Sequence, residues 1–419
     1  MKTGAPPLPG HQMSVEEQHR LAVDRLLPAR IMHPGDSDDA ARGLRLCDLH
    51  GAAAIAWGGG TQMSLGAVPG RYQIAFSTER MTRLLEYEPG DLTCRVEAGM
   101  RLVDLQATLT AKGQRLPLDP PHPERATVGG MVAANTNGLS RARHGTVRDW
   151  VIGIAVAYPS GKVARAGGKV VKNVAGYDLM KLHTGALGTL GVITEVNFKL
   201  QTRPEAERTL LGHFEAPAAA LKAGIELAHQ YLAPAAIVLM DRATLWNCGM
   251  TADWRWTLAI KLEGYAREID PAQDVTATIV RAAGGRLEGQ AAPETFWVEA
   301  RDWSAARDND AVVLYGMTSL TGLHTLLPAA IAEGPLLAQP AAGVVHVRVP
   351  AESAGKALAR MRAAAGADGH VIVARAPAAI KQQLDIWGPP PRGFDVMRSL
   401  KQALDPNGTL SPGRLVGAL

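Results

Sequence analysis

Apolar and polar residues alternate most regularly along residues 192–200, directly after a segment rich in glycine. The alternation predicts a β-strand with one face formed by Val192, Thr194, Val196, Phe198 and Leu200. In the preceding segment, glycines stand at positions 176, 185, 188 and 191, where a backbone turns sharply or approaches another group closely. A simple core element needs neither so many glycines nor so many polar neighbours, so we interpret residues 169–195 as one wall of a cofactor site.

The spacing of apolar residues predicts an α+β arrangement for the first 115 residues. Ser14 and Glu17 fit a capping box, which marks the start of a helix. In order, the expected elements are a helix over 15–27, a helix over 40–49 and a strand at 52–57. After the glycine loop come two strands, the second at 92–98, and a helix with Leu102, Leu105 and Leu109 on one face that ends at Gly113.

Two further glycine-rich loops lie in the same region. Residues 58–62 follow an apolar strand, and their Gly-Gly-Gly-Thr-Gln turn would present several backbone N–H groups to one point, which suits a phosphate. Residues 126–130 open a short helix whose free N–H groups would face an anion. Each loop alone is also typical of a flexible turn, but three glycine-rich segments in one domain favour a ligand site. The first loop lacks the G-x-G-x-x-G pattern, which argues against a Rossmann domain.

The next residues predict a basic loop and then a hairpin that turns at residues 159–161. In the loop, His144 lies between arginines at positions 141, 143 and 148. His144 is either a structural histidine or part of an exposed basic edge.

After residue 207 glycine becomes scarcer, and the pattern changes to β-α-β-β-α-β, the order of a ferredoxin-like module. Asp270 is expected to cap a helix with Pro271 at its first position. The pattern partly recurs after residue 303, so we expect an α+β cap domain with an internal repeat. His346 and Arg348 share a face of one predicted strand, where they either meet a substrate carboxylate or serve a cap surface or interface.

Composition excludes several classes of protein. Charged residues make up 20% of the 419 residues and the net charge is +4, without the long basic run that follows a nucleic acid, so no nucleic acid partner is expected. Cys47, Cys94 and Cys248 lack C-x-x-C spacing, so we expect neither a metal nor an iron–sulfur cluster on this chain. No signal peptide or membrane-spanning run is seen, and a cytoplasmic location is expected.

Several stretches together carry a family resemblance: WGGGTQ (57–62), the segment from LPLDP to NTNG (116–138), RHGTVRDWVIG (143–153), KVVKNVAGYDLMKLHTGALGTLGVITEV (169–196) and LDPNGTLSPGR (404–414). They resemble the FAD-binding E subunit of glycolate oxidase complexes, within the vanillyl-alcohol-oxidase-type (PCMH-type) FAD family. Most residues that carry the resemblance lie in 50–205 and 384–415, and few lie between these two regions.

The resemblance implies a PCMH-type FAD-binding domain of two α+β subdomains plus an α+β, ferredoxin-like cap domain. The expected division is an N-terminal tail and helix (1–30), the FAD-binding domain (31–206), the cap domain (207–380), and a C-terminal segment (381–419) that returns to the FAD domain. Trp387 and Arg414 are then candidates for lying near the flavin.

The resemblance also implies which residues hold FAD. The first loop would hold the diphosphate, the second would continue this cradle, and the third segment would offer backbone contacts. The implied residues are Gly58, Gly59, Gly60, Thr61, Gln62, Thr127, Val128, Gly129, Gly130, Met131, Ala134, Asn135, Gly138, Val192, Ile193 and Thr194. Some relatives attach FAD to a histidine or cysteine beside the first loop; this loop has neither, so non-covalent FAD is expected.

The implied function is electron transfer in a complex that oxidises a small 2-hydroxy acid such as glycolate or D-lactate. The implied partners are a related catalytic FAD subunit and an iron–sulfur subunit, through which any contact with the inner membrane would be peripheral. Catalytic relatives carry a late H-x-G-D-G-N-x-H motif that is absent here, which favours a relay FAD. The alternatives are a non-catalytic assembly subunit or a self-sufficient dehydrogenase, in which Lys172, Tyr177, Lys181 or Arg348 would orient the carboxylate.

Overall fold

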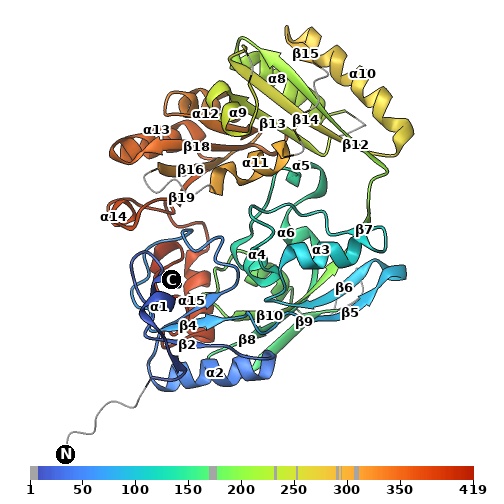
Figure 1. The fold of residues 1–419 in the computed structure, drawn as a ribbon. Coiled ribbons are helices and arrows are strands. Elements are labelled where there is room, and N and C mark those ends of the chain that lie inside the picture. The colour runs from blue at the N-terminus through green and yellow to red at the C-terminus, as the bar shows by residue number, and fades with distance from the viewer. Residues whose placement is uncertain are drawn as a thin grey trace, which may run out of the picture.

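The computed structural model describes residues 8–168, 177–230, 234–251, 253–288, 292–293, 295–305 and 311–419. The N-terminal half forms the lower body in Figure 1 and residues after about 206 form the upper body. The last part of the chain returns to the lower body, where the C-terminus lies beside the small N-terminal sheet. Residues 169–176, including Lys172, lie outside the described residues.

The lower body begins with a four-stranded sheet. Its order is β1 (His11–Gln12), β2 (Arg30–Met32), β4 (Ile74–Ser77) and β3 (Ala54–Trp57), with β2, β4 and β3 parallel. The capping box of Ser14 and Glu17 is confirmed, but helix α1 (Val15–Arg20) is shorter than expected. Helix α2 (Ser37–Leu49) begins three residues earlier than expected because the Asp36 side chain caps it.

A second, five-stranded antiparallel sheet forms the rest of the lower body. Its order is β5 (Leu84–Glu88), β6 (Thr93–Glu97), β10 (Val192–Lys199), β8 (Val151–Ala157) and β9 (Val163–Gly167). The short helices of this body are α3 (Leu102–Thr110), α4 (Val128–Ala134), α5 (Arg141–His144), α6 (Val147–Trp150) and α7 (Leu179–His183). The predicted hairpin turn is confirmed, with Gly161 at φ +83° between β8 and β9.

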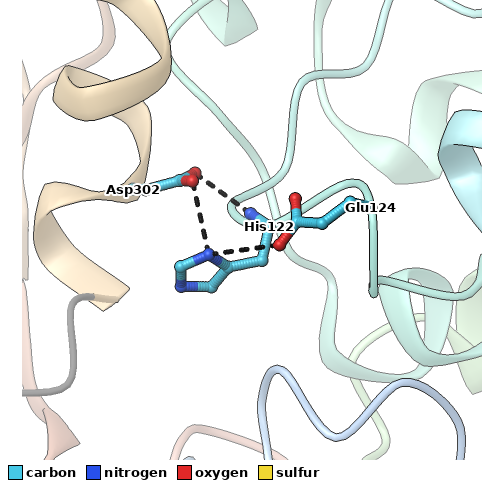
Figure 2. A group of neighbouring side chains, drawn as sticks. All are labelled: His122, Glu124 and Asp302. Carbon is cyan, nitrogen blue, oxygen red and sulfur yellow. Dashed lines mark hydrogen bonds and ion pairs between the residues drawn. The ribbon is translucent and has the colours of Figure 1, made fainter.

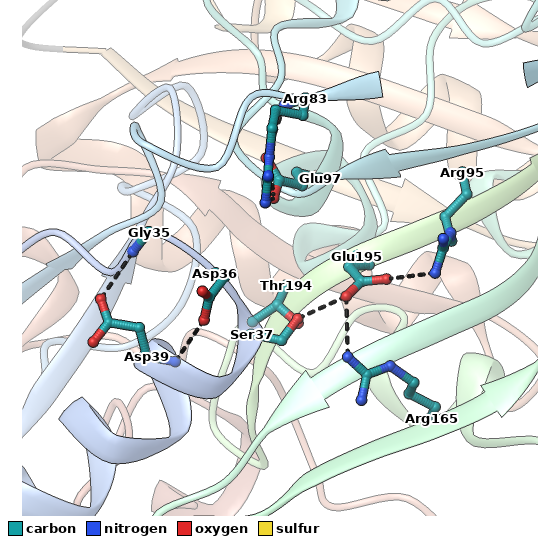
Figure 3. A network of polar contacts seen from close by, with 10 residues as sticks. All are labelled: Gly35, Asp36, Ser37, Asp39, Arg83, Arg95, Glu97, Arg165, Thr194 and Glu195. Carbon is teal, nitrogen blue, oxygen red and sulfur yellow. Dashed lines mark hydrogen bonds and ion pairs between the residues drawn. The ribbon is translucent and has the colours of Figure 1, made fainter. Parts of the chain in front are cut away.

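At Thr194, strand β10 contains one extra residue relative to β8. Thr194 and Glu195 both contact the Ser37 hydroxyl at 2.8 Å (Figure 3), although strict alternation would put them on opposite faces. Ile193 packs into the core on the other side of the sheet. The prediction of one continuous face along 192–200 is therefore wrong, because a β-bulge shifts the alternation at Thr194.

The upper body is one eight-stranded antiparallel sheet built from two ferredoxin-like units. Its order is β15 (Arg286–Glu288), β12 (Ala206–Phe214), β14 (Trp256–Gly264), β13 (Ala236–Asp241), β17 (Leu336–Gln339), β18 (Val344–Pro350), β16 (Ala311–Met317) and β19 (His370–Arg375). The strand order of the first four is mirrored by that of the last four, and β13 pairs with β17 at the junction. The expected internal repeat is thus confirmed, and it includes strand β17, which the sequence pattern did not predict.

Helices α8 (Pro217–Ala228), α10 (Ala266–Ala282), α12 (Leu323–Ile331) and α13 (Ala354–Ala365) cover the outer face of this sheet (Figure 1). Helices α9 (Arg242–Asn247) and α11 (Phe296–Asp302) contribute to a separate core cluster, which Leu139 of the lower body joins. The expected cap at Asp270 is wrong. Helix α10 begins at Ala266, with Glu268 bonding back to the Tyr265 N–H. Pro271 lies inside the helix, where it lacks the N–H that would bond to the Arg267 carbonyl.

Lysine 401, in helix α15 (Phe394–Leu404), fastens the returning C-terminal segment. The Lys401 ammonium donates to the Thr189 carbonyl at 2.8 Å, to the Leu410 carbonyl at 3.0 Å and to the Asp405 carboxylate at 2.5 Å. The last residues of the chain are thereby tied to the glycine-rich turn before β10.

Buried His183, at the end of α7, makes stability depend on pH. Burial lowers the pKa of His183 to about 4 while its ring contacts the Tyr158 hydroxyl at 2.8 Å. Between pH 6.5 and 4 the unfolded chain therefore binds the extra proton, so the free energy of unfolding falls as pH falls. We predict that His183→Gln reduces the loss in the free energy of unfolding between pH 6.5 and pH 4 by on the order of 3 kcal/mol.

The measurement is urea unfolding at several pH values between 4 and 7. The exposed His324 provides a matched control, and His324→Gln should leave the slope unchanged. An unchanged slope in His183→Gln would contradict the assignment.

Candidate functional site

Three glycine-rich segments of the lower body meet around one pocket, which we call the cofactor pocket. It has a volume of about 690 Å³ including its open mouth. Its lining consists of Ala56 to Met63, Thr78, Thr127, Gly129, Gly130, Ala133, Ala134, Leu187, Gly188, Gly191 to Ile193, and Arg414. The segments are far apart in sequence, and the β-sheets bring them together.

Most of the residues proposed from the sequence line this pocket: Gly58, Gly59, Gly60, Thr61, Gln62, Thr127, Gly129, Gly130, Ala134, Val192 and Ile193. Val128 and Met131 instead pack into the core beneath α4, and the Thr194 hydroxyl is directed to Ser37. Gly138 packs against Asp119, and Asn135 lines a neighbouring cavity. Leu187 and Gly188 also line the pocket and lie in the segment 169–195 that the sequence indicated as one of its walls. The sequence analysis missed Thr78, which only the tertiary fold brings to this place.

The first loop, at Gly58 and Gly59, packs so closely against residues 125–127 that no side chain fits between the two segments. A Cβ atom on Gly59 would lie 1.6 Å from the Arg125 carbonyl oxygen, and one on Gly58 would lie 2.1 Å from Thr127 Oγ1. Gly60 has a φ of +70°, which disfavours any side chain. Within the part of the chain that the structure describes, the backbone N–H groups of residues 58–62 donate no hydrogen bond. These N–H groups are therefore the donors left for an anion.

The second loop behaves differently from the sequence expectation. The Val128 N–H donates to the Met100 carbonyl at 2.9 Å, and the Gly129 N–H donates to the Ala98 carbonyl at 2.7 Å. Only the Gly130 N–H is left with a long 3.4 Å bond to Thr127 Oγ1. The prediction that several free N–H groups of α4 face an anion is thus wrong, because the adjacent chain segment occupies them.

Buried charges hold the first loop from behind. The Arg414 guanidinium donates to the Met63 carbonyl at 2.7 Å and to the Leu65 carbonyl at 2.5 Å. Lys381 bonds to Asp24 at 2.8 Å and to a carbonyl of the same loop. Burial lowers the pKa of Lys381 and of Arg414 and raises the pKa of Asp24. The ion pair between Lys381 and Asp24 opposes the shift of each of these two partners. The returning C-terminal segment thereby fixes the loop.

A second cavity, which we call the chamber, lies between the two bodies and has a volume of about 1270 Å³ including its open mouth. It shares the lining residues Thr61, Gln62, Ala134 and Leu187 with the cofactor pocket, so the two cavities adjoin. Its other wall is the inner face of the upper sheet.

Of the catalytic candidates named from the sequence, Tyr177, Lys181 and Arg348 are described and line neither cavity. Lys172 lies outside the described residues. Tyr177 is 90% exposed, and Lys181 pairs with Asp178 at 2.5 Å on the surface. Arg348 lies over the Trp303 ring, 4.4 Å from its centroid. His346 does line the chamber, as do Tyr315 and Arg375, which the sequence analysis did not name.

His122, Glu124 and Asp302 lie together at the junction of the two bodies (Figure 2). The imidazole Nδ1 is 3.3 Å from Asp302 and 3.7 Å from Glu124, and the backbone N–H of His122 donates to Asp302 at 3.0 Å. Asp302 is also paired with Arg301 at 2.7 Å. These contacts join the loop around His122 in the lower body to helix α11 in the upper body.

Comparison with known families matches residues 28–167 to the family described as "FAD binding domain" and residues 389–415 to "FAD linked oxidases, C-terminal domain". The chain therefore carries an FAD-binding domain, and its cofactor is FAD. The two matched regions contain the first two glycine-rich segments of the pocket lining and Arg414, whereas the third segment, from Leu187 to Ile193, lies outside both.

Among curated proteins, the chain is 33% identical to glycolate oxidase subunit GlcD of Bacillus subtilis over 52% of this chain and 47% of that protein. It is 45% identical to glycolate oxidase subunit GlcE of Escherichia coli over 30% of this chain and 37% of that protein. A D-lactate dehydrogenase of Archaeoglobus fulgidus is 32% identical over 54% of this chain and 50% of that protein. The matches thus span about half or less of each relative.

Solved structures of similar fold include p-cresol methylhydroxylase with substrate bound, with a TM-score of 0.72, 15% identity, and coverage of 96% of this chain and 92% of that chain. The 4-ethylphenol oxidase from Gulosibacter chungangensis is similar with a TM-score of 0.71 and 16% identity. The match covers 96% of this chain and 93% of that chain. The predicted PCMH-type α+β fold is confirmed. No helix among the described residues is long and apolar enough to cross a membrane.

The buried ion pair behind the loop yields a prediction. Lys381→Met leaves the Asp24 carboxylate buried without its cation, so we expect a loss of about 3–5 kcal/mol in the free energy of unfolding. Adding Asp24→Asn should restore most of it. Urea unfolding measures both, with the exposed pair of Arg101 and Asp104 as control, where Arg101→Met should change little. A double variant as unstable as Lys381→Met would contradict this account.

Proposed function

We propose, from the FAD-binding domain that the chain carries, that it is an FAD-dependent oxidoreductase subunit acting on the CH–OH group of a 2-hydroxy acid. In this proposal it works in a complex that oxidises glycolate to glyoxylate, and electrons leave its FAD for a partner iron–sulfur subunit. The observation that carries the proposal is the cofactor pocket: three remote glycine-rich segments line one cavity, with unpaired N–H donors in the first.

The residues present fit FAD. The N–H groups of residues 58–62 would hold the diphosphate, and the segments around Gly130 and Val192 would contact the rest of the cofactor. When bound, the flavin supplies a two-electron acceptor that can release electrons one at a time. Neither histidine nor cysteine is among the described residues that line the cofactor pocket, which supports non-covalent binding.

An iron–sulfur partner is proposed because this chain offers no cluster ligands of its own. Cys47, Cys94 and Cys248 are all buried, and burial raises the pKa of each thiol to about 12. Cluster ligation needs several thiolates close together, which these three are not. The names of the GlcD and GlcE relatives support assignment to a multi-subunit oxidase.

A self-sufficient 2-hydroxy-acid dehydrogenase is the second candidate, favoured by the chamber that adjoins the cofactor pocket. Anaerobic addition of glycolate or D-lactate to the FAD-loaded chain separates the two. If the chain acts only as a relay, its flavin bleaches only when the catalytic partner is present. Rapid bleaching of the isolated chain would assign the oxidation to this chain.

The pocket predicts the effect of one substitution on flavin retention. Gly130 lines the cofactor pocket. A Cβ atom on Gly130 would meet only Thr127 Oγ1, at 3.0 Å, so a larger residue is compatible with helix α4. Its side chain would occupy the part of the pocket that FAD needs. We expect Gly130→Leu to be purified colourless while the wild-type chain is yellow.

The matched control is Gly90→Leu, at an exposed glycine with no atom within 4 Å of an added Cβ. It should keep its flavin and unfold near the wild-type midpoint. Gly130→Leu should unfold near the midpoint of the flavin-free wild type, because bound FAD stabilises only the folded chain. Acid precipitation of the wild type should release the flavin into the supernatant. Flavin retained by Gly130→Leu would show that the pocket is wrongly assigned, and flavin left in the acid pellet would contradict non-covalent binding.

A further inference from the structure

Three side chains of the kinds that bind divalent metal ions face one another where the two bodies meet (Figure 2). His122 and Glu124 belong to the loop between β7 (Gln114–Arg115) and α4, and Asp302 is the last residue of α11. One imidazole nitrogen and one oxygen of each carboxylate all lie within 4.8 Å of one another. We call these three residues the junction cluster, because both bodies contribute to it.

The spacing of the donor atoms fits a zinc ion. His122 Nδ1 is 3.3 Å from Asp302 Oδ2 and 3.7 Å from Glu124 Oε1. Bonds from zinc to nitrogen and oxygen are about 2.0–2.2 Å long, which puts two ligand atoms of a tetrahedral site roughly 3.3 Å apart. The Glu124 side chain is 57% exposed, so a small rotation of this side chain can shorten the longer distance.

A contact outside the cluster orients the imidazole as a metal ligand. His122 Nε2 lies 3.5 Å from the Ala305 carbonyl oxygen. A carbonyl oxygen only accepts, so this contact needs a proton on Nε2 and, in the neutral ring, leaves the lone pair on Nδ1. That lone pair and the two carboxylates are then three acceptors that face one another with no proton between them. A cation completes such an arrangement, and histidine ligands of metals commonly donate their other N–H to a backbone carbonyl in this way.

Asp302 can bind a metal although it is paired with Arg301. Arg301 Nε donates to Oδ1 at 2.7 Å, and the guanidinium also donates to Oδ2 at 3.2 Å. The backbone N–H of His122 donates to Oδ1 at 3.0 Å. Each carboxylate oxygen has two lone pairs, so these described contacts fill Oδ1 and leave one lone pair on Oδ2, the atom nearer the imidazole. Arg301 thereby orients this ligand and offsets one of the two negative charges.

We propose that the junction cluster binds a divalent metal ion of the zinc type, with His122 Nδ1, Glu124 and Asp302 as ligands and water in the remaining position. One nitrogen and two carboxylate oxygens suit Zn²⁺, whereas Ca²⁺ and Mg²⁺ take oxygen ligands. The inference goes beyond the proposed function and does not depend on it, since the three residues line neither the cofactor pocket nor the chamber.

A cation at this place would join the two bodies beside the chamber. Pro121 comes directly before His122, and Ser304 and Ala305 follow closely after Asp302; these three neighbours line the chamber. The His122 carbonyl accepts the N–H groups of residues 125 and 126 at 3.0 and 2.7 Å, which anchors the loop in the lower body. Metal binding would therefore hold together two segments that line the chamber from opposite bodies.

Local sequence patterns could not show this cluster. The expectation that no metal binds rested on the spacing of the cysteines, and the junction cluster contains no cysteine. His122 and Asp302 are 180 residues apart, so only the packing of the upper body on the lower body brings them together.

The test uses the FAD-loaded full chain, treated with a chelator and then dialysed against zinc chloride. Elemental analysis should find one zinc per chain, and isothermal titration calorimetry with Zn²⁺ should show one saturable site. Glu124→Gln and Asp302→Asn should each weaken zinc binding about tenfold or more. The matched control is Glu79→Gln: Glu79 pairs with His33 at 2.7 Å but belongs to no three-ligand group among the described residues, so this variant should bind zinc as the wild type does.

Thermal unfolding provides a second readout. Zinc should raise the unfolding midpoint of the wild type but not that of Glu124→Gln, because the complete site exists only in the folded wild-type chain. Glu124 is exposed, so Glu124→Gln keeps the test open if Asp302→Asn does not fold. The absence of saturable zinc binding would leave the cluster an ion pair only and overturn the proposal, as would equally tight zinc binding by the wild type and both variants.

The flavin absorbance separates this inference from the proposed function. A yellow chain that binds no zinc overturns the inference alone. A colourless wild-type chain overturns the proposed function, and zinc binding that depends on Glu124 and Asp302 in such a chain would still support the metal site.

Discussion

The contact between two stretches of backbone, at Gly58 to Gly60 and at Arg125 to Thr127, is the constraint on which the cofactor site depends. The first loop approaches the second so closely that a single methyl group on Gly59 would lie 1.6 Å from a carbonyl oxygen. The N–H groups of residues 58–62 have no hydrogen-bond partner among the described residues, and these residues line the pocket. Glycine is needed here because two backbones must touch.

The remaining structure stabilises that contact. Lys401 ties the end of the chain to the turn before β10, and Arg414 and Lys381 hold the first loop from behind. The bulge at Thr194 turns two successive polar side chains towards α2 and so joins the two sheets of the lower body. The inner face of the upper sheet lines the chamber, which adjoins the cofactor pocket.

Local signals in the sequence were enough for the glycine loops, the hairpin at Gly161 and the ferredoxin-like order of strands, since each depends on residues close in sequence. Local signals did not predict features that depend on contacts between segments far apart in the sequence. The free N–H groups expected at α4 are occupied by the segment at Ala98 to Met100. Periodicity could not show the bulge at Thr194, because one inserted residue leaves the pattern looking regular. Tyr315 and Arg375 reach the chamber only through strand pairing between distant segments.

The central claim is that the N–H groups of residues 58–62 bind the diphosphate of FAD, while those of Val128 and Gly129 already have protein partners. Residue-resolved amide hydrogen exchange on the flavin-free and FAD-loaded chain tests it most directly. The account predicts slow exchange at Val128 and Gly129 in both states, and exchange at 58–62 that slows strongly only with FAD. Unchanged exchange at 58–62 on FAD binding, with new protection at Val128 and Gly129 instead, would contradict it.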